Sequence, residues 1–187
     1  DEIEPKIKMA SAVAVGPGLG MSDEVREFVK EIITKVDAPL IIDADGLNAI
    51  TDDPSILLSL KHTPVITPHP GEMSRLTGMT VREILDDTVN LARDFAMKYN
   101  TVVVLKDARS VIAAPDGRVI INITGNPSMA TGGSGDVLTG VISSFIAQGI
   151  DPFFAAAAGA YIHGLSGDIC KDKMGSYGVM SWDIAEN

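Results

Sequence analysis

The sequence predicts a single α/β domain, residues 1–187, with a mainly parallel central sheet between two layers of helices. Short β-branched runs recur along the chain, and each is followed by Gly, Pro, Asp or Lys before the next pattern begins. The runs are continuously apolar, which is typical of strands covered on both faces. The chain has 187 residues, 45% hydrophobic and 21% charged, which fits one sizeable globular domain.

Four parallel strands are predicted, followed by a late hairpin. The strands correspond to residues 12–15, 40–42, 65–67 and 102–105. Residues 111–114 and 119–121 are apolar runs that flank Pro115-Asp116-Gly117, so this region is predicted to form a β-hairpin.

Helical spacing and capping residues predict the intervening helices. Thr80 and Glu83 have capping-box spacing, and Asp53 precedes Pro54 as an N-cap precedes a first helical residue. The last helix is rich in Ala and Gly, which predicts close packing on its neighbours. The predicted helices begin after Ser22, at Pro54, after Thr80 (continuous to about Tyr99), at Val137 (to about Gly149) and at Pro152 (to about Cys170).

Composition excludes several classes of function. The net charge of −10 argues against binding to a nucleic-acid backbone. No apolar stretch reaches the ~18–20 residues that span a bilayer, and the N-terminus lacks the basic start of a signal peptide. Cys170 is the single cysteine, so a reducing cytoplasm is the expected compartment.

The segment TGNPSMATGGSGD, residues 124–136, predicts an anion site at the start of a helix. Free amides in the first turn bind a phosphate or oxyanion where glycines allow close approach, here at Gly133, Ser134 and Gly135. Asp136 would then accept a proton from a hydroxyl held beside that anion. The alternative is a glycine-rich turn with Asp136 as an ordinary N-cap.

Other phosphate motifs do not match. The sequence has no Gly-Lys-Ser/Thr, which excludes the usual P-loop. Gly16-Pro17-Gly18-Leu19-Gly20 follows a predicted strand but lacks the third glycine of a dinucleotide fingerprint. The segment is therefore either a ligand-contacting loop or a tight connecting turn.

Three further sets of polar residues follow predicted strands, where ligands bind in open α/β sheets. Asp43 and Asp45 could bind a metal through water or accept ligand hydroxyls, or one could cap a helix at Asn48; we favour a supporting role. His69 stands between two prolines and is either a ligand contact or a turn residue. Lys106 and Arg109 are phosphate or adenosine contacts or, alternatively, solvated charges. His62 and His163 have no zinc-site spacing, and no metal ligand is assigned.

Taken together, the motifs GPGLG, DADGLN, TPHPGE, VLK, TGNPSMATGGSGDVLTG and AYIHGLSGD occur in an order that resembles the ADP- or ATP-dependent NAD(P)H-hydrate dehydratases of the ribokinase-like superfamily. The resemblance runs from about Val13 to Asp183. It implies a ribokinase-like three-layer α/β/α fold and a metabolite-repair lyase. Such enzymes return hydrated NADH or NADPH to the intact dinucleotide by phosphorylating the ring hydroxyl from ADP or ATP and eliminating phosphate.

The resemblance also implies roles for individual residues. Asp136 would be the catalytic base, and the amides of Gly133 to Gly135 would form the anion hole. Hydrated NAD(P)H would contact Gly18, His69 and Asp136. The adenine nucleotide would contact the segment Lys106, Asp107, Ala108, Arg109 and Ser110 together with Gly135, with Mg²⁺ shielding its phosphates. Asp43, Asp45, Asn48 and Asn126 would support these contacts.

Departures from the family pattern generate further expectations. Asp107 stands where glycine is usual, and its carboxylate would repel a phosphate unless it points away. Ser128 replaces a glycine in GNPGMAT. The family domain begins upstream of GPGLG with strands that this sequence lacks, so we expect an N-terminally incomplete domain whose exposed sheet edge is paired by another chain or destabilises the fold. The resemblance also suggests a homotetramer and, in some relatives, a fused epimerase domain.

Two alternative functions remain open from sequence. One is a kinase of the same superfamily that acts on a vitamin precursor or sugar, since a GSGD-type loop alone does not distinguish the two chemistries. The other is a non-catalytic nucleotide-binding domain, which Asp107 favours.

Overall fold

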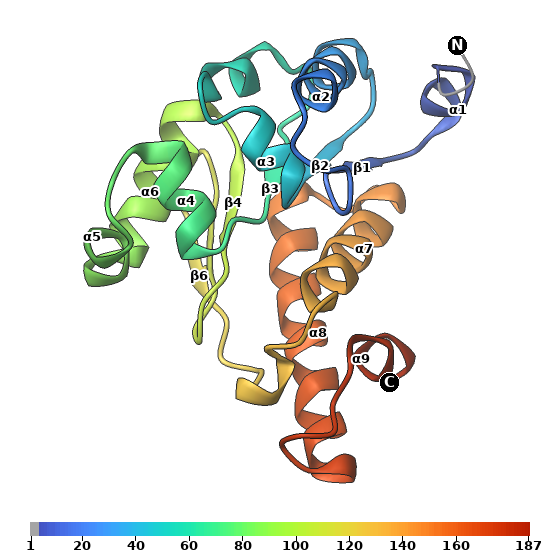
Figure 1. Ribbon diagram of the computed structural model, residues 1–187, viewed down its shortest axis with the longest axis vertical. Helices are drawn as coiled ribbons and strands as arrows, with labels where there is room; N and C mark the ends of the chain where they lie inside the picture. The colour runs from blue at the N-terminus through green and yellow to red at the C-terminus, as the bar shows by residue number, and fades with distance from the viewer. Residues whose placement is uncertain (1–3) are drawn as a thin grey trace.

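A computed structural model describes residues 4–187 and contains one six-stranded sheet in which the strands follow one another in sequence order (Figure 1). The first four strands pair in parallel, and the last two pair antiparallel as a hairpin. Both features confirm the predicted topology. The strands are β1 (Val13–Val15), β2 (Leu40–Ile42), β3 (Val65–Ile66), β4 (Val102–Leu105), β5 (Val111–Ala113) and β6 (Val119–Ile121).

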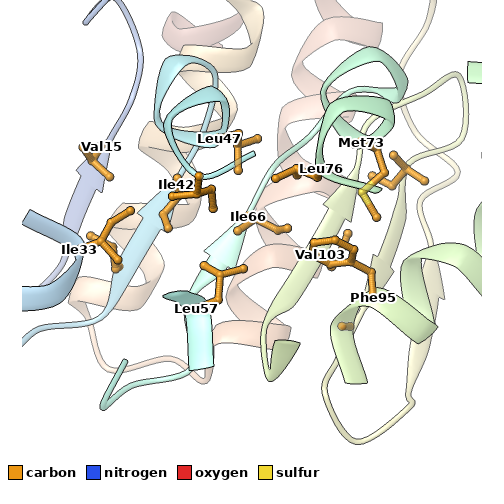
Figure 2. Close-up of a cluster of buried hydrophobic side chains, with 14 of the residues drawn as sticks. Val15, Ile33, Ile42, Leu47, Leu57, Ile66, Met73, Leu76, Phe95 and Val103 are labelled. Carbon is orange, nitrogen blue, oxygen red and sulfur yellow. The ribbon is translucent and has the colours of Figure 1, made fainter. Parts of the chain in front are cut away.

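Neighbouring residues of a strand face opposite sides of the sheet and contribute to two separate cores. Leu40 and Ile42 pack on the face covered by α2 (Asp23–Lys35) and α6 (Thr88–Tyr99), whereas Ile41 packs on the opposite face with α7 (Ser134–Ala147) and α8 (Pro152–Met174). Figure 2 shows the first of these cores, in which Ile42 lies among buried side chains from several elements. The molecule therefore has the expected three-layer α/β/α architecture.

The capping residues predicted from sequence begin the expected elements. The Ser22 hydroxyl accepts a hydrogen bond from the Val25 amide at the start of α2. The Asp53 side chain caps η1 (Pro54–Ser59), but this element is a 3₁₀ helix. Four further helices were not predicted: α1 (Glu4–Met9), α3 (Asp45–Ala49), α4 (Pro70–Thr77) and α9 (Ser181–Glu186).

The prediction of one continuous helix from residue 81 to Tyr99 was wrong. The predicted capping box is present, with the Thr80 hydroxyl accepting from the Glu83 amide, but α5 (Val81–Asp86) ends at Asp86 and Asp87 is its C-cap. Asp87 adopts φ −149°, and its carboxylate accepts a hydrogen bond from the Asn90 amide to begin α6. A second N-cap inside the apolar pattern thus interrupts the helix without interrupting its hydrophobic face.

The glycines of α8 allow the close packing that its composition predicts. A Cβ on Gly159 would lie 2.6 Å from the Ile142 side chain, and one on Gly167 would lie 2.2 Å from the Met129 sulfur. Helices α7 and α8 run side by side on one face of the sheet, and α8 extends beyond the sheet toward α9 (Figure 1). In residues 4–187, no helix is both long enough and apolar enough to cross a bilayer.

Candidate active site

A cavity of about 540 Å³ lies where the ends of β3 and β4 meet the beginning of α7 and the middle of α8. This is the edge of the sheet at which open α/β proteins bind ligands. Many residues predicted from sequence line it: His69, Lys106, Asp107, Ala108, Ser110, Asn126, Ser134 and Gly135. Segments from four distant parts of the sequence therefore meet at one cavity.

The turn that begins α7 offers an anion two of the three amides named in the sequence analysis. Gly133 is the N-cap residue at φ +85°, a conformation that favours glycine. The Ser134 amide already donates to the Thr131 carbonyl oxygen, whereas the amides of Gly133 and Gly135 donate to no acceptor within residues 4–187. Those two amides remain available to an anion.

Asp136 is the third residue of α7 and is exposed. The interpretation of Asp136 as the N-cap is therefore wrong, because Gly133 occupies that position. Its carboxylate makes no hydrogen bond or ion pair with any residue between 4 and 187. The group is accessible to a ligand at the positive end of the helix.

Lys106 follows β4, and its side chain lies between Asp43 and the turn that begins α7 (residues 132–135, here called the glycine turn). Its Nζ lies 2.9 Å from Oδ1 of Asp43, which follows β2 and is almost fully buried. Oδ2 of Asp43 accepts a hydrogen bond of 2.8 Å from the Thr139 hydroxyl on α7. A Cβ on Gly135 would lie 3.4 Å from the Lys106 nitrogen, so the ammonium group is next to the first turn of α7.

His69 is the N-cap of α4 (Pro70–Thr77), a helix that was not predicted from the TPHPGE loop. Its Nδ1 accepts hydrogen bonds from the amides of Gly71 and Glu72, which places the proton of the neutral ring on Nε2. The buried Glu72 accepts from the His69 amide at 2.8 Å. The capping box fixes the orientation of the ring beside the cavity.

The loop between β6 and α7 is held by a residue that the sequence reasoning missed. Asp168, on α8, accepts hydrogen bonds from the Gly125 amide at 3.0 Å and from the Asn126 side chain at 2.8 Å. The side-chain oxygen Oδ1 of Asn126 in turn accepts from the Ser128 amide. Asp168 lies within the motif AYIHGLSGD, so the motif itself was the available signal.

His163 was also overlooked, because only zinc spacing was considered for it. It lines the cavity from α8, and its Nε2 lies 3.4 Å from the Ser134 hydroxyl oxygen. Burial lowers the pKa of His163 below its usual 6.5, the backbone of Ser134 raises it, and the charge of Lys106 lowers it. A neutral imidazole is therefore favoured in the cavity wall.

The remaining predicted residues lie outside the cavity lining. Gly18 is exposed at φ +72° in the GPGLG loop, and the Gly20 amide of that loop donates to Asp45 Oδ2 at 2.8 Å. Asn48 accepts from Arg75 Nε at 2.8 Å and does not begin a helix. Asp45 thus supports the GPGLG loop, and Asn48 contacts α4 through Arg75. Arg109 donates to the Ile123 carbonyl oxygen.

Two observations concern the acidic side chains at and around the cavity. Asp107 is exposed and belongs to the residues that line the cavity. Within residues 4–187, no three His, Cys, Asp or Glu side chains converge to hold a metal ion.

Comparison with known proteins identifies relatives over the full sequence. The family profile described as NAD(P)H-hydrate dehydratase matches residues 1–187. The bifunctional NAD(P)H-hydrate repair enzyme Nnr of Moorella thermoacetica is 44% identical over 189 residues, which cover 100% of this chain and 36% of that protein. The ADP-dependent (S)-NAD(P)H-hydrate dehydratase of Neisseria meningitidis is 37% identical over 94% of this chain and 60% of its own length. The chain thus spans about a third to three fifths of these relatives.

Solved structures give the same grouping. The ADP/ATP-dependent NAD(P)H-hydrate dehydratase of Bacillus subtilis, co-crystallised with ATP and Mg²⁺, has a TM-score of 0.81 at 32% identity, and the match covers 97% of this chain and 65% of that one. A ribokinase-like superfamily protein of Enterococcus faecalis has a TM-score of 0.84 at 30% identity, covering 99% and 63%.

Proposed function

Because this chain belongs to the NAD(P)H-hydrate dehydratase family, we propose that it dehydrates hydrated NADH and NADPH with ADP or ATP as phosphoryl donor. The observation that carries the proposal is the cavity in which the segment Lys106–Ser110 meets the glycine turn of α7. A cation and free helix amides converge there, and both favour a phosphoryl group.

The proposed reaction begins with transfer of a phosphoryl group to the ring hydroxyl. The hydroxyl oxygen attacks phosphorus, its proton passes to the Asp136 carboxylate, and the bond from phosphorus to the nucleotide oxygen breaks. The amides of Gly133 and Gly135 stabilise the charge that develops on the phosphoryl oxygens. Lys106 supplies a positive charge next to the same turn.

The second step is elimination. The carbon–oxygen bond of the phosphorylated ring breaks and phosphate leaves with that electron pair, while the neighbouring carbon gives its proton to water and the electrons of its carbon–hydrogen bond form the new double bond. The ring double bond is restored, so phosphorylation serves to convert a poor leaving group into a good one.

We assign the hydrated dinucleotide to Gly18, His69 and Asp136, and the adenine nucleotide to the segment from Lys106 to Ser110 together with Gly135. The fixed imidazole of His69 supports this assignment because its orientation is set before ligand binding. Mg²⁺ would accompany the nucleotide and reduce repulsion between its phosphates and the acidic chain.

A second candidate is binding of a nucleotide without catalysis. Asp107 favours it, because a carboxylate in the cavity opposes the accumulation of negative charge during phosphoryl transfer. The accessible carboxylate of Asp136 favours catalysis, because a residue that only capped the helix would be engaged with the backbone.

One assay separates these functions. The full-length protein is incubated with hydrated NADH, Mg²⁺ and either ADP or ATP, and the return of dihydronicotinamide absorbance is followed. Recovery with one nucleotide supports the dehydratase. A folded protein that binds nucleotide but restores no absorbance with either would leave the non-catalytic function, and phosphorylation of a hydroxymethyl substrate instead would indicate a kinase.

We also propose a homo-oligomer in a reducing cytoplasm. Exposed apolar side chains recur along one side of α8 at Tyr161, Leu165 and Ile169, a spacing that suits helix packing against another subunit. Cys170 is buried and unpaired, as in proteins kept reduced. Sedimentation of the full-length protein as a monomer would exclude the homotetramer.

A further inference from the structure

We propose that Asp43 is a positioning residue that aligns the phosphoryl-donor side of the site with the hydroxyl-acceptor side; this rests on the proposed dehydratase function. Asp43 lies directly after β2, and its side chain is only 2% exposed. Both of its carboxylate oxygens are bound by side chains from other elements. A buried carboxylate so fully engaged constrains all the groups that bind it.

The side chain of Asp43 holds the donor side. Lys106 Nζ approaches Oδ1 at 2.9 Å from the end of β4, and the Thr139 hydroxyl approaches Oδ2 at 2.8 Å from the second turn of α7. Oδ2 is also 3.8 Å from where a Cβ on Gly135 would lie. One carboxylate therefore sets the distance between the lysine ammonium and the amides of the glycine turn.

The backbone of Asp43 holds the acceptor side. Its amide donates to the Val15 carbonyl oxygen at 3.1 Å, and its carbonyl oxygen accepts from the Gly46 amide at 2.9 Å. The carbonyl oxygen also lies 1.8 Å from where a Cβ on Gly16 would be, so only glycine fits at the start of GPGLG. The loop assigned to the hydrated dinucleotide thus rests directly on the residue that holds Lys106.

A competing role for Asp43 is that of a simple counter-ion to Lys106. The two roles differ in what they predict for catalysis. A counter-ion competes with phosphate for the lysine, so removing its charge strengthens nucleotide binding and leaves kcat unchanged. A positioning residue affects the alignment of reacting atoms, so disturbing it lowers kcat, because small displacements cost on the order of 10²-fold in rate.

Thr139→Val tests alignment without changing any charge. Valine keeps the branched shape but removes the hydrogen bond to Asp43 Oδ2. We expect kcat for hydrated NADH to fall by about tenfold to a hundredfold while the Kd for ADP changes by less than about threefold. Thr139→Ser restores the donor and should return kcat to near the wild-type value. Thr34→Val is the matched control, because the exposed Thr34 hydroxyl only donates within α2.

Asp43→Asn tests the charge itself. Asparagine has the same shape, so a fall in kcat with retained ADP binding supports positioning. Tighter ADP binding with an unchanged kcat would establish the counter-ion role and overturn the proposal. Asp37→Asn is the control, because Asp37 forms the same kind of pair with Lys61 at 2.8 Å on the exposed surface.

The outcomes also separate this inference from the proposed function. If the wild-type protein restores no absorbance from hydrated NADH, the dehydratase function fails. If the wild type is active and Thr139→Val retains the wild-type kcat, the positioning role fails while the function stands. Thermal unfolding of each variant identifies a loss of fold. If Asp43→Asn does not fold, the comparison of Thr139→Val with Thr139→Ser decides the proposal.

Discussion

His163 Nε2 lies 3.4 Å from the Ser134 hydroxyl oxygen, so the middle of α8 meets the first turn of α7 at the wall of the cavity. Burial lowers the pKa of this imidazole below 6.5 in the folded protein. Below pH 6.5 the unfolded chain therefore binds more protons at this position than the folded chain does. By linkage, His163 reduces the free energy of unfolding as pH falls below 6.5 and has no such effect above it.

His163→Gln removes this titration. We expect the free energy of unfolding of the wild type, relative to that of the variant, to decrease between pH 7.5 and 5.5. Urea unfolding at several pH values measures the difference, and exposed His62→Gln serves as the control. Parallel wild-type and His163→Gln profiles would contradict the expectation.

Gly135→Ala should weaken ADP binding. The added Cβ would lie 3.4 Å from Lys106 Nζ and would project toward the site where phosphate is expected. We predict a loss of about tenfold in affinity, equivalent to about 1.4 kcal/mol, measured by titration calorimetry. Gly140→Ala, on the same helix with nothing within 4 Å of its Cβ, should leave affinity unchanged and raise stability by about 1 kcal/mol. Equal affinities of the two variants would argue against phosphate at this turn.

Asp136→Asn should abolish turnover and spare nucleotide binding. A general base contributes about 10²- to 10⁴-fold to rate, and the carboxylate is accessible at the start of α7. The fold should persist, because a first-turn carboxylate contributes only about 0.3–1 kcal/mol. The checks are kcat for hydrated NADH and Kd for ADP. Simultaneous loss of binding and activity would instead point to a structural role for this residue.

Thr67→Val should stabilise the protein. The Thr67 hydroxyl is buried and has no hydrogen-bond partner within the described residues 4–187, so its burial is uncompensated. We expect a gain of about 1 kcal/mol in the free energy of unfolding, measured with urea. Thr101→Val is the matched comparison, because that buried hydroxyl donates to the Pro64 carbonyl oxygen at 3.0 Å and its removal should destabilise by about 1 kcal/mol. Destabilisation by both variants would show that Thr67 has a partner in solution.

The sequence predicted those parts of the fold that depend on local chemistry. Apolar runs located the strands, and Ser22 and Thr80 marked helix starts because capping requires only neighbouring residues. The break at Asp87 was missed because the apolar spacing continues across it. Similarly, α4 was read as a loop because the position of His69 between Pro68 and Pro70 suggested a turn and obscured its role as an N-cap.

Site residues were predictable where a motif adjoined the end of a strand and not where tertiary contact defines them. Lys106 and the glycine turn carry their signal locally, since each follows or begins a regular element. Asp168 and His163 act through contacts with residues far away in sequence, at Asn126 and Ser134. The pairing of Asp43 with Thr139 spans 96 positions and has no local signature at all.

The glycines of α8 bring this helix into direct contact with the loop that leads to α7. A Cβ on Gly164 would lie 2.3 Å from the Thr124 hydroxyl oxygen, and one on Gly167 would overlap Met129, so helix and loop are in direct contact. For this loop to move away from α8, these contacts and the two hydrogen bonds to Asp168 must be lost together. The hydrogen-bonded amide protons of Gly125 and Met129 should therefore exchange with solvent more slowly than those of an ordinary surface loop.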